Sequence, residues 1–87
     1  MAINVEFYGI PRQRTAAACT RIDATNLGEL LTTLAERFPR LATECLDAGR
    51  LQPGYVANIN GERFVTDPAT ALTDGDSVLI LSADAGG

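Results

Sequence analysis

The hydrophobic period changes twice along this chain of 87 residues, and this limits the folds it can adopt. Near the N-terminus Ile3, Val5 and Phe7 alternate with less apolar residues, which is the period of a strand with one buried face. From Asn26 apolar residues recur at spacings of three and four, which predicts an amphipathic helix. Alternation returns over residues 55–59. Because helix and strands each bury one face, we expect a two-layer α+β domain.

The predicted helix has recognisable ends. Asn26 with Glu29 three residues later resembles a capping box, and Pro39 stops the helix. The apolar stripe expected to enter the core consists of Leu27, Leu30, Leu31, Leu34, Ala35 and Phe38. A shorter helical piece is expected to follow and to end near Gly49.

Turn signals divide the rest of the chain into strands. Residues 9–14 are expected to form a turn and residues 15–23 to run back as the second strand of a hairpin. The dipeptide Asn60-Gly61 is preferred in type I′ turns, since both positions need positive φ. We expect a return strand over 62–66 and a final strand that includes Val78 and Ile80.

The predicted element order is strand, strand, helix, strand, strand, strand. The first and last strands would lie side by side and parallel in the middle, which describes the β-grasp (ubiquitin-like) fold. We therefore predict a mixed sheet of about five strands packed on one main helix over residues 1–81. Residues 82–87 are predicted to be a flexible tail that ends in Gly-Gly.

Composition argues against several functions. The chain has seven basic residues, all of them Arg, and eleven acidic residues. The resulting net charge of −4 favours a basic-surfaced protein partner over nucleic acid. The chain has no His, and Cys19 and Cys45 are far apart, so we expect no metal site and two buried cysteines. No apolar run approaches the ~18 residues of a membrane span. We expect a cytoplasmic protein without a membrane partner.

Three motifs resemble those of the MoaD/ThiS family of ubiquitin-like sulfur carriers. Asn60-Gly61-Glu62 resembles the hairpin of that family, and the segment Leu72-Thr73-Asp74-Gly75-Asp76-Ser77-Val78 resembles its turn into the last strand. Gly86-Gly87 resembles the terminal pair. The resemblance covers essentially the whole chain.

The resemblance implies a function for the C-terminal carboxylate of Gly87. A ubiquitin-activating-type (MoeB/ThiF-like) adenylyltransferase would adenylate it with ATP, and sulfide would then displace AMP to leave a thiocarboxylate for a sulfur-accepting enzyme. ATP and Mg²⁺ would belong to that partner, so the chain would be a carrier without a cofactor and not an enzyme. Because glycine has no Cβ, a narrow channel can close around the tail residues Asp84, Ala85 and Gly86.

Strand alternation also predicts a surface for the partner. If Val78 and Ile80 point inward, then their neighbours point outward. The predicted partner-binding surface consists of Tyr8, Leu79 and Leu81, bordered by Val56 and Arg63.

Other functions stay open from the sequence alone. The chain has Ser82, Ala83 and Asp84 where many family members carry Pro and a bulky apolar residue, which argues against the small subunit of molybdopterin synthase in particular. A ubiquitin-like modifier joined to lysines and a plain β-grasp interaction module are the other two alternatives. The pathway, whether molybdopterin, thiamine, cysteine or another, is not specified, and neither is the oligomeric state.

Overall fold

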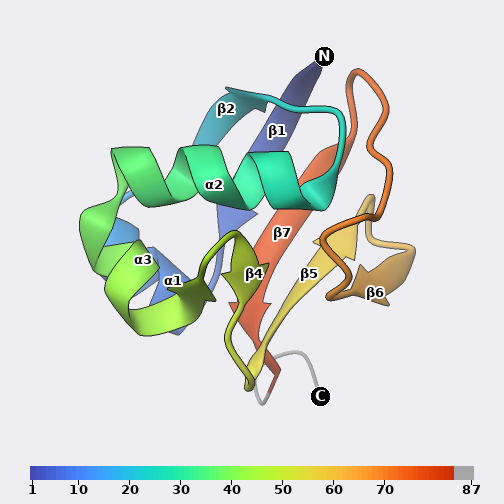
Figure 1. Ribbon diagram of the computed structural model, residues 1–87. Helices are drawn as coiled ribbons and strands as arrows, with labels where there is room; N and C mark the ends of the chain where they lie inside the picture. The colour runs from blue at the N-terminus through green and yellow to red at the C-terminus, as the bar shows by residue number, and fades with distance from the viewer. Residues whose placement is uncertain (84–87) are drawn as a thin grey trace.

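The computed structural model describes residues 1–83 (Figure 1). The predicted tail residues Asp84, Ala85, Gly86 and Gly87 lie outside the described part. In chain order the elements are β1 (Ala2–Phe7), α1 (Ile10–Thr15), β2 (Cys19–Asp23), α2 (Leu27–Arg37), α3 (Pro39–Cys45), β3 (Leu46–Asp47), β4 (Arg50–Leu51), β5 (Tyr55–Ile59), β6 (Arg63–Val65) and β7 (Ser77–Ser82).

The main sheet is mixed and has the strand order β2-β1-β7-β5-β6. Strands β1 and β7 are parallel, with Val5 beside Val78, while the other neighbours in this sheet are antiparallel. Figure 1 shows these two strands in the middle of the sheet with α2 crossing one face. The β-grasp prediction, including the parallel central pair, is confirmed.

Helix α2 begins at the predicted cap. The side-chain oxygen of Asn26 accepts a hydrogen bond of 2.8 Å from the N–H of Glu29. The Glu29 carboxylate accepts one of 2.9 Å from the N–H of Thr25, one residue before the cap. The first bond satisfies one of the backbone donors left over at the helix start, and the second satisfies the N–H just before the cap. The helix ends at Arg37, and its C-cap Phe38 directly precedes Pro39.

The core lies between α2 and the inner face of the sheet. The four leucines of the helical stripe are fully buried, while Ala35 and Phe38 are partly buried and pack against the core. From the sheet it includes Ile3, Val5, Phe7, Ile22, Ala57, Ile59, Val78 and Ile80. Helix α2 therefore covers the inner face of the sheet and, within residues 1–83, leaves the outer face without a covering helix (Figure 1).

Residues 9–14 contradict the turn prediction, because most of them form α1. Gly9 precedes the helix with φ 68°, Pro11 lies in its first turn, and Ala16 ends it with φ 56°. Proline is favoured in a first helical turn, where its missing N–H leaves no bond unmade and its φ is already helical. The second strand is accordingly shorter than predicted and begins at Cys19.

The hairpin between β5 and β6 combines a predicted turn with an unexpected register. Asn60 and Gly61 have φ of 56° and 70°, and the N–H of Glu62 donates to the Ile59 carbonyl at 2.9 Å, as in a type I′ turn. Yet Ile59 pairs with Arg63, so Glu62 is one extra residue on the return strand. An offset of one residue exchanges the two faces of a strand.

The turn before β7 is tied to this hairpin through Asp76. Its carboxylate accepts hydrogen bonds from the Asn60 amide at 3.0 Å and from the N–H of Thr73 at 2.8 Å. The Asn60 oxygen in turn accepts from the N–H of Ser77 at 2.8 Å. The bond from Asn60, followed by that from Thr73, lowers the pKa of Asp76 below its ordinary value.

Stability should therefore depend on Asp76 in acid. A carboxylate whose pKa is lower in the folded state stabilises the fold above its unfolded pKa of about 3.9, and this stabilisation is lost as pH falls through the folded pKa. We expect the free energy of unfolding of Asp76→Asn to fall less steeply below about pH 4 than that of the wild type. Thermal unfolding between acid and neutral pH measures this. Parallel curves for the two proteins would contradict it.

Candidate functional site

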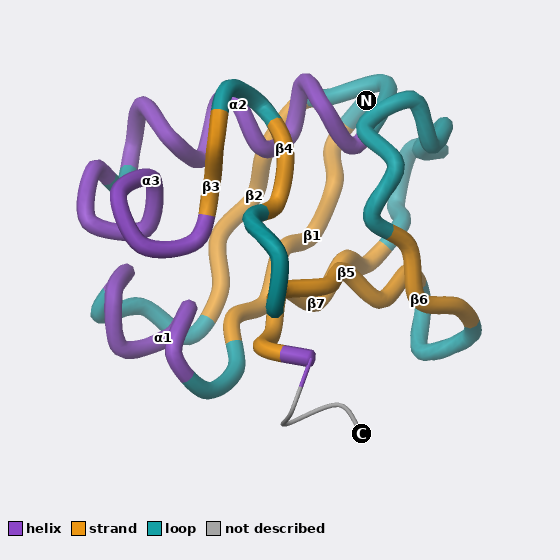
Figure 2. The backbone as a smooth tube through the Cα atoms, turned by 60° about the horizontal axis from the view of Figure 1, so that its bottom comes forward, coloured by secondary structure: helices purple, strands orange, loops and turns teal. Residues whose placement is uncertain are grey.

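The end of β7 fixes where the C-terminal segment starts. Because β1 and β7 are parallel, both finish at the same end of the sheet. Strand β7 ends at Ser82, and the N–H of Ala83 donates to the Gly54 carbonyl at 2.7 Å. Figure 2 shows α1 and the end of β7 at this same end of the molecule, which we call the tail end.

Three of the predicted surface residues lie on the outer face of the sheet near the tail end. Tyr8 is 55% exposed, and its N–H donates to the Ile80 carbonyl at 3.0 Å, which extends the β1–β7 ladder. Leu79 and Val56 are half-buried. They alternate with the inward-facing Ile80 and Ala57, so they belong to the outer face.

Two of the predicted surface residues need correction. Leu81 is on the outer side by alternation but is only 4% exposed, so it supports its cross-strand neighbour Val56 and offers little contact surface. Arg63 is exposed, but it pairs with the inward-facing Ile59 and therefore belongs to the helix side of the sheet. The cause is the extra residue Glu62, which moves Arg63 to the other face.

Phe64 was missed by the sequence analysis. It is 56% exposed and pairs with Asn58, so it lies on the outer face. A two-residue turn without the extra Glu62 would have placed Phe64 inward, so the alternation rule alone gives no signal for it. The surface formed by Tyr8, Val56, Phe64 and Leu79 is called the outer patch below. Exposed aromatic side chains on one face of a sheet are typical of protein interfaces.

Asn58 lies inside the outer patch and is unusual. It pairs with Leu79 on one side and Phe64 on the other, and it is only 8% exposed. Within residues 1–83 its buried side-chain oxygen has no hydrogen-bond partner. An unsatisfied buried acceptor costs about 1–3 kcal/mol. The patch therefore holds a polar group that does not contribute to the stability of the free protein.

Replacing this amide should stabilise the domain. Leucine has nearly the same shape as asparagine, and Asn58→Leu removes the unsatisfied oxygen while adding apolar contact with Leu79. We expect a gain of about 1 kcal/mol, or a rise of about 4–8 °C in the midpoint of thermal unfolding. The control is Asn4→Leu on the exposed outer side of β1. Equal midpoints for Asn58→Leu and the wild type would show that the oxygen costs nothing.

Groups suited to nucleophilic or metal chemistry are few in the described residues. Burial raises the pKa of the Cys45 thiol, which disfavours the reactive thiolate. Cys19 was predicted to be buried but is exposed, because it pairs with Glu6 on the outer side of the sheet. Over residues 1–83 no three His, Cys, Asp or Glu side chains are grouped to hold a metal ion.

None of the described helices has the length and apolarity needed to cross a membrane.

Comparison with known proteins identifies the family. The profile of the ThiS family matches residues 5–87. The chain belongs to the ThiS family. Members of this family are small sulfur carrier proteins. Among curated proteins, none matches this ThiS-family chain by sequence.

Solved structures show the ubiquitin-like fold of this ThiS-family protein. SAMP1 from Haloferax volcanii is 20% identical with a TM-score of 0.80, and the match covers 100% of both chains. CysO from Mycobacterium tuberculosis is 26% identical with a TM-score of 0.77 over 93% of this chain and 98% of that one. A chain of the BexX/CysO complex from Amycolatopsis orientalis is 20% identical with a TM-score of 0.78 over 98% and 99%.

Proposed function

We propose that this ThiS-family protein carries sulfur as a thiocarboxylate on Gly87. The observation that carries the proposal is the family match, which runs through residue 87 and so includes Gly86-Gly87. The described fold supports it, because β7 ends at the tail end of the sheet beside the outer patch. A partner that docks on this patch can also reach the segment that follows Ser82.

The chemistry requires an enzyme to activate the carboxylate. A C-terminal carboxyl group has a pKa of about 3.3–3.7, so at neutral pH it is ionised and a poor electrophile. Its attack on the α-phosphate of ATP gives an acyl adenylate and pyrophosphate. Sulfide then attacks the acyl carbon, the bond to AMP breaks, and the thiocarboxylate remains. The charge on the phosphates needs cationic and metal support, which we assign to a MoeB/ThiF-like adenylyltransferase that binds ATP and Mg²⁺.

On this proposal the protein is the substrate of two partner enzymes. The adenylyltransferase loads the tail, and a sulfur-accepting enzyme unloads it. Solved complexes support protein partners of this kind, since CysO from Amycolatopsis orientalis is seen with BexX and molybdopterin-converting factor from Helicobacter pylori as a complex of subunits 1 and 2. The outer patch is the surface that we assign to both encounters. We also propose that the protein acts in the cytoplasm, where ATP is available to the activating enzyme.

Intact-mass analysis tests the proposal directly. The wild-type protein is incubated with the adenylyltransferase of its own host, ATP, Mg²⁺ and a sulfide source. We expect a mass gain equal to one sulfur minus one oxygen, which is lost when the protein is treated with a sulfur acceptor or when ATP is left out. A protein that is adenylated but never gains sulfur would refute the carrier function.

A ubiquitin-like modifier is the second candidate. It is favoured by the structural likeness to small archaeal modifier protein 1 from Haloferax volcanii, with a TM-score of 0.78 at 19% identity. On this alternative Gly87 would be joined to lysines of other proteins. The chain has no lysine of its own, so it could not form chains through its own side chains. Trypsin cleaves after Arg63, the last basic residue, so mass spectrometry of tryptic peptides in which a lysine carries residues 64–87 would distinguish the two functions. The specific alternative, the small subunit of molybdopterin synthase, predicts a stable complex with a large subunit.

A further inference from the structure

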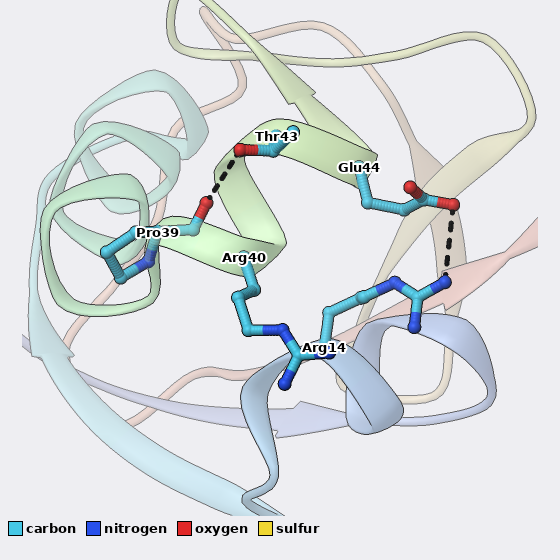
Figure 3. Close-up of a pocket in the computed structure, with 5 residues that line it drawn as sticks. All are labelled: Arg14, Pro39, Arg40, Thr43 and Glu44. Atoms are coloured by element: carbon cyan, nitrogen blue, oxygen red, sulfur yellow. Dashed lines mark hydrogen bonds and ion pairs between the residues drawn. The ribbon is translucent and has the colours of Figure 1, made fainter.

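A second surface, separate from the outer patch, lies between α1 and α3. These helices pack together beside a hollow of about 470 Å³ lined by Arg14, Pro39, Arg40, Thr43 and Glu44. Figure 3 shows Arg14 reaching from α1 toward α3 and Arg40 reaching from α3 toward α1. Two long cationic side chains from facing helices thus line the same hollow.

The positive charge of this hollow is only partly compensated. Its lining has two guanidinium groups and one carboxylate, in a protein whose net charge is −4. Arg14 lies 3.6 Å from Glu44, which is longer than the 2.7–2.9 Å of a charge-assisted hydrogen bond. In residues 1–83 neither guanidinium donates a hydrogen bond to another group. The hollow therefore offers unused donors in the planar geometry that suits a carboxylate or phosphate.

The position of the hollow connects it to the tail. Helix α1 follows β1 directly and packs against β7, so it lies at the tail end of the sheet, as Figure 2 shows. A protein that holds the segment after Ser82 is therefore close to α1. We propose that the Arg14–Arg40 hollow receives a carboxylate from an Asp or Glu side chain of the adenylyltransferase. This proposal rests on the proposed function above.

A carboxylate of a protein fits the hollow better than a free anion. Arg14 is about one-third exposed, with a side-chain exposure of 33%, so each ion pair is screened by water and weak. A carboxylate fixed on a docked protein meets the two arginines at high local concentration, whereas a free anion does not. Phosphate sites commonly use backbone N–H groups as well, but Pro39 in the first turn of α3 has none, and the Thr43 hydroxyl already donates to the Pro39 carbonyl at 3.1 Å.

The first experiment measures adenylation through ATP–pyrophosphate exchange as a function of carrier concentration. For the double variant Arg14→Gln/Arg40→Gln, we expect the concentration for half-maximal exchange to rise about ten-fold with an unchanged plateau. The control Arg50→Gln/Arg63→Gln removes the same charge from other exposed sites and should change this concentration by about two-fold or less. Equal effects of both double variants would overturn the proposal and leave the proposed function intact.

The second experiment needs no partner enzyme. Acetate is titrated into labelled protein while the side-chain N–H signals of the arginines are followed by NMR. We expect Arg14 and Arg40 to shift together at high acetate concentration, while Arg50 does not, and we expect Arg40→Gln to abolish the shift of Arg14. No selective shift, or a tighter response to inorganic phosphate than to acetate, would overturn the proposal. If neither the wild type nor any variant supported exchange, the proposed function would fail. This titration would still show whether the hollow binds a carboxylate.

Discussion

Replacing Gly86 with valine is expected to slow thiocarboxylate formation by at least ~100-fold, the loss that a misplacement of about 1 Å at a reacting group can cause. The penultimate residue must pass with Gly87 into the activating enzyme, where a β-branched side chain needs space that a channel fitted to glycine does not have. The time course of the mass gain on the intact protein measures the rate. Unfolding should be unchanged, since the buried residues of the described fold end at Leu81.

Matched variants separate this steric effect from general damage. Gly86→Ala adds one methyl group and should lie between the wild type and Gly86→Val. Thr66→Val introduces the same side chain at an exposed position after β6 and should load at the wild-type rate. If Gly86→Val loaded within about three-fold of the wild type, the channel argument would be wrong, because so small a loss is less than 1 kcal/mol of barrier.

The fold was predictable because its strongest sequence signals are local. The leucine stripe of α2 and the alternation of β1, β5 and β7 each specify a buried face, and burying these faces leaves few arrangements. Helix α1 escaped prediction because six residues give too short a pattern, although Pro11 in the first turn was a usable signal.

The outer patch was only half predictable, for a different reason. Alternation places Tyr8, Val56 and Leu79 correctly because β1, β5 and β7 are regular. The single extra residue Glu62 moves Arg63 to the inner face and Phe64 to the outer face. Amino-acid composition does not predict where such an extra residue occurs. The exposure of a residue also depends on its neighbours, so Leu81 could be assigned to a face but not to a degree of burial.

Two adjacent residues of β7 should separate stability from partner binding. Ile80 is fully buried in the core, and Ile80→Ala should lower the free energy of unfolding by about 2–5 kcal/mol, since it removes apolar contacts and leaves a cavity. For a domain of this size the total is about 4–13 kcal/mol, so this is a large part of it. Leu79 is half-buried on the outer face, and Leu79→Ala should cost about 1 kcal/mol.

Ile80→Ala should thus lose more stability than Leu79→Ala. When adenylation is measured at a temperature where both proteins are folded, Leu79→Ala should instead show the larger loss. Leu79→Ala removes the centre of the outer patch, and we expect the carrier concentration for half-maximal ATP–pyrophosphate exchange to rise about ten-fold or more. Ile80→Ala leaves that surface in place and should keep the wild-type value. Denaturant unfolding and exchange kinetics on the same preparations give both quantities. If Leu79→Ala bound the enzyme as well as the wild type, docking through the outer patch would be wrong, because a half-buried leucine at the centre of an interface cannot be removed without loss of contact.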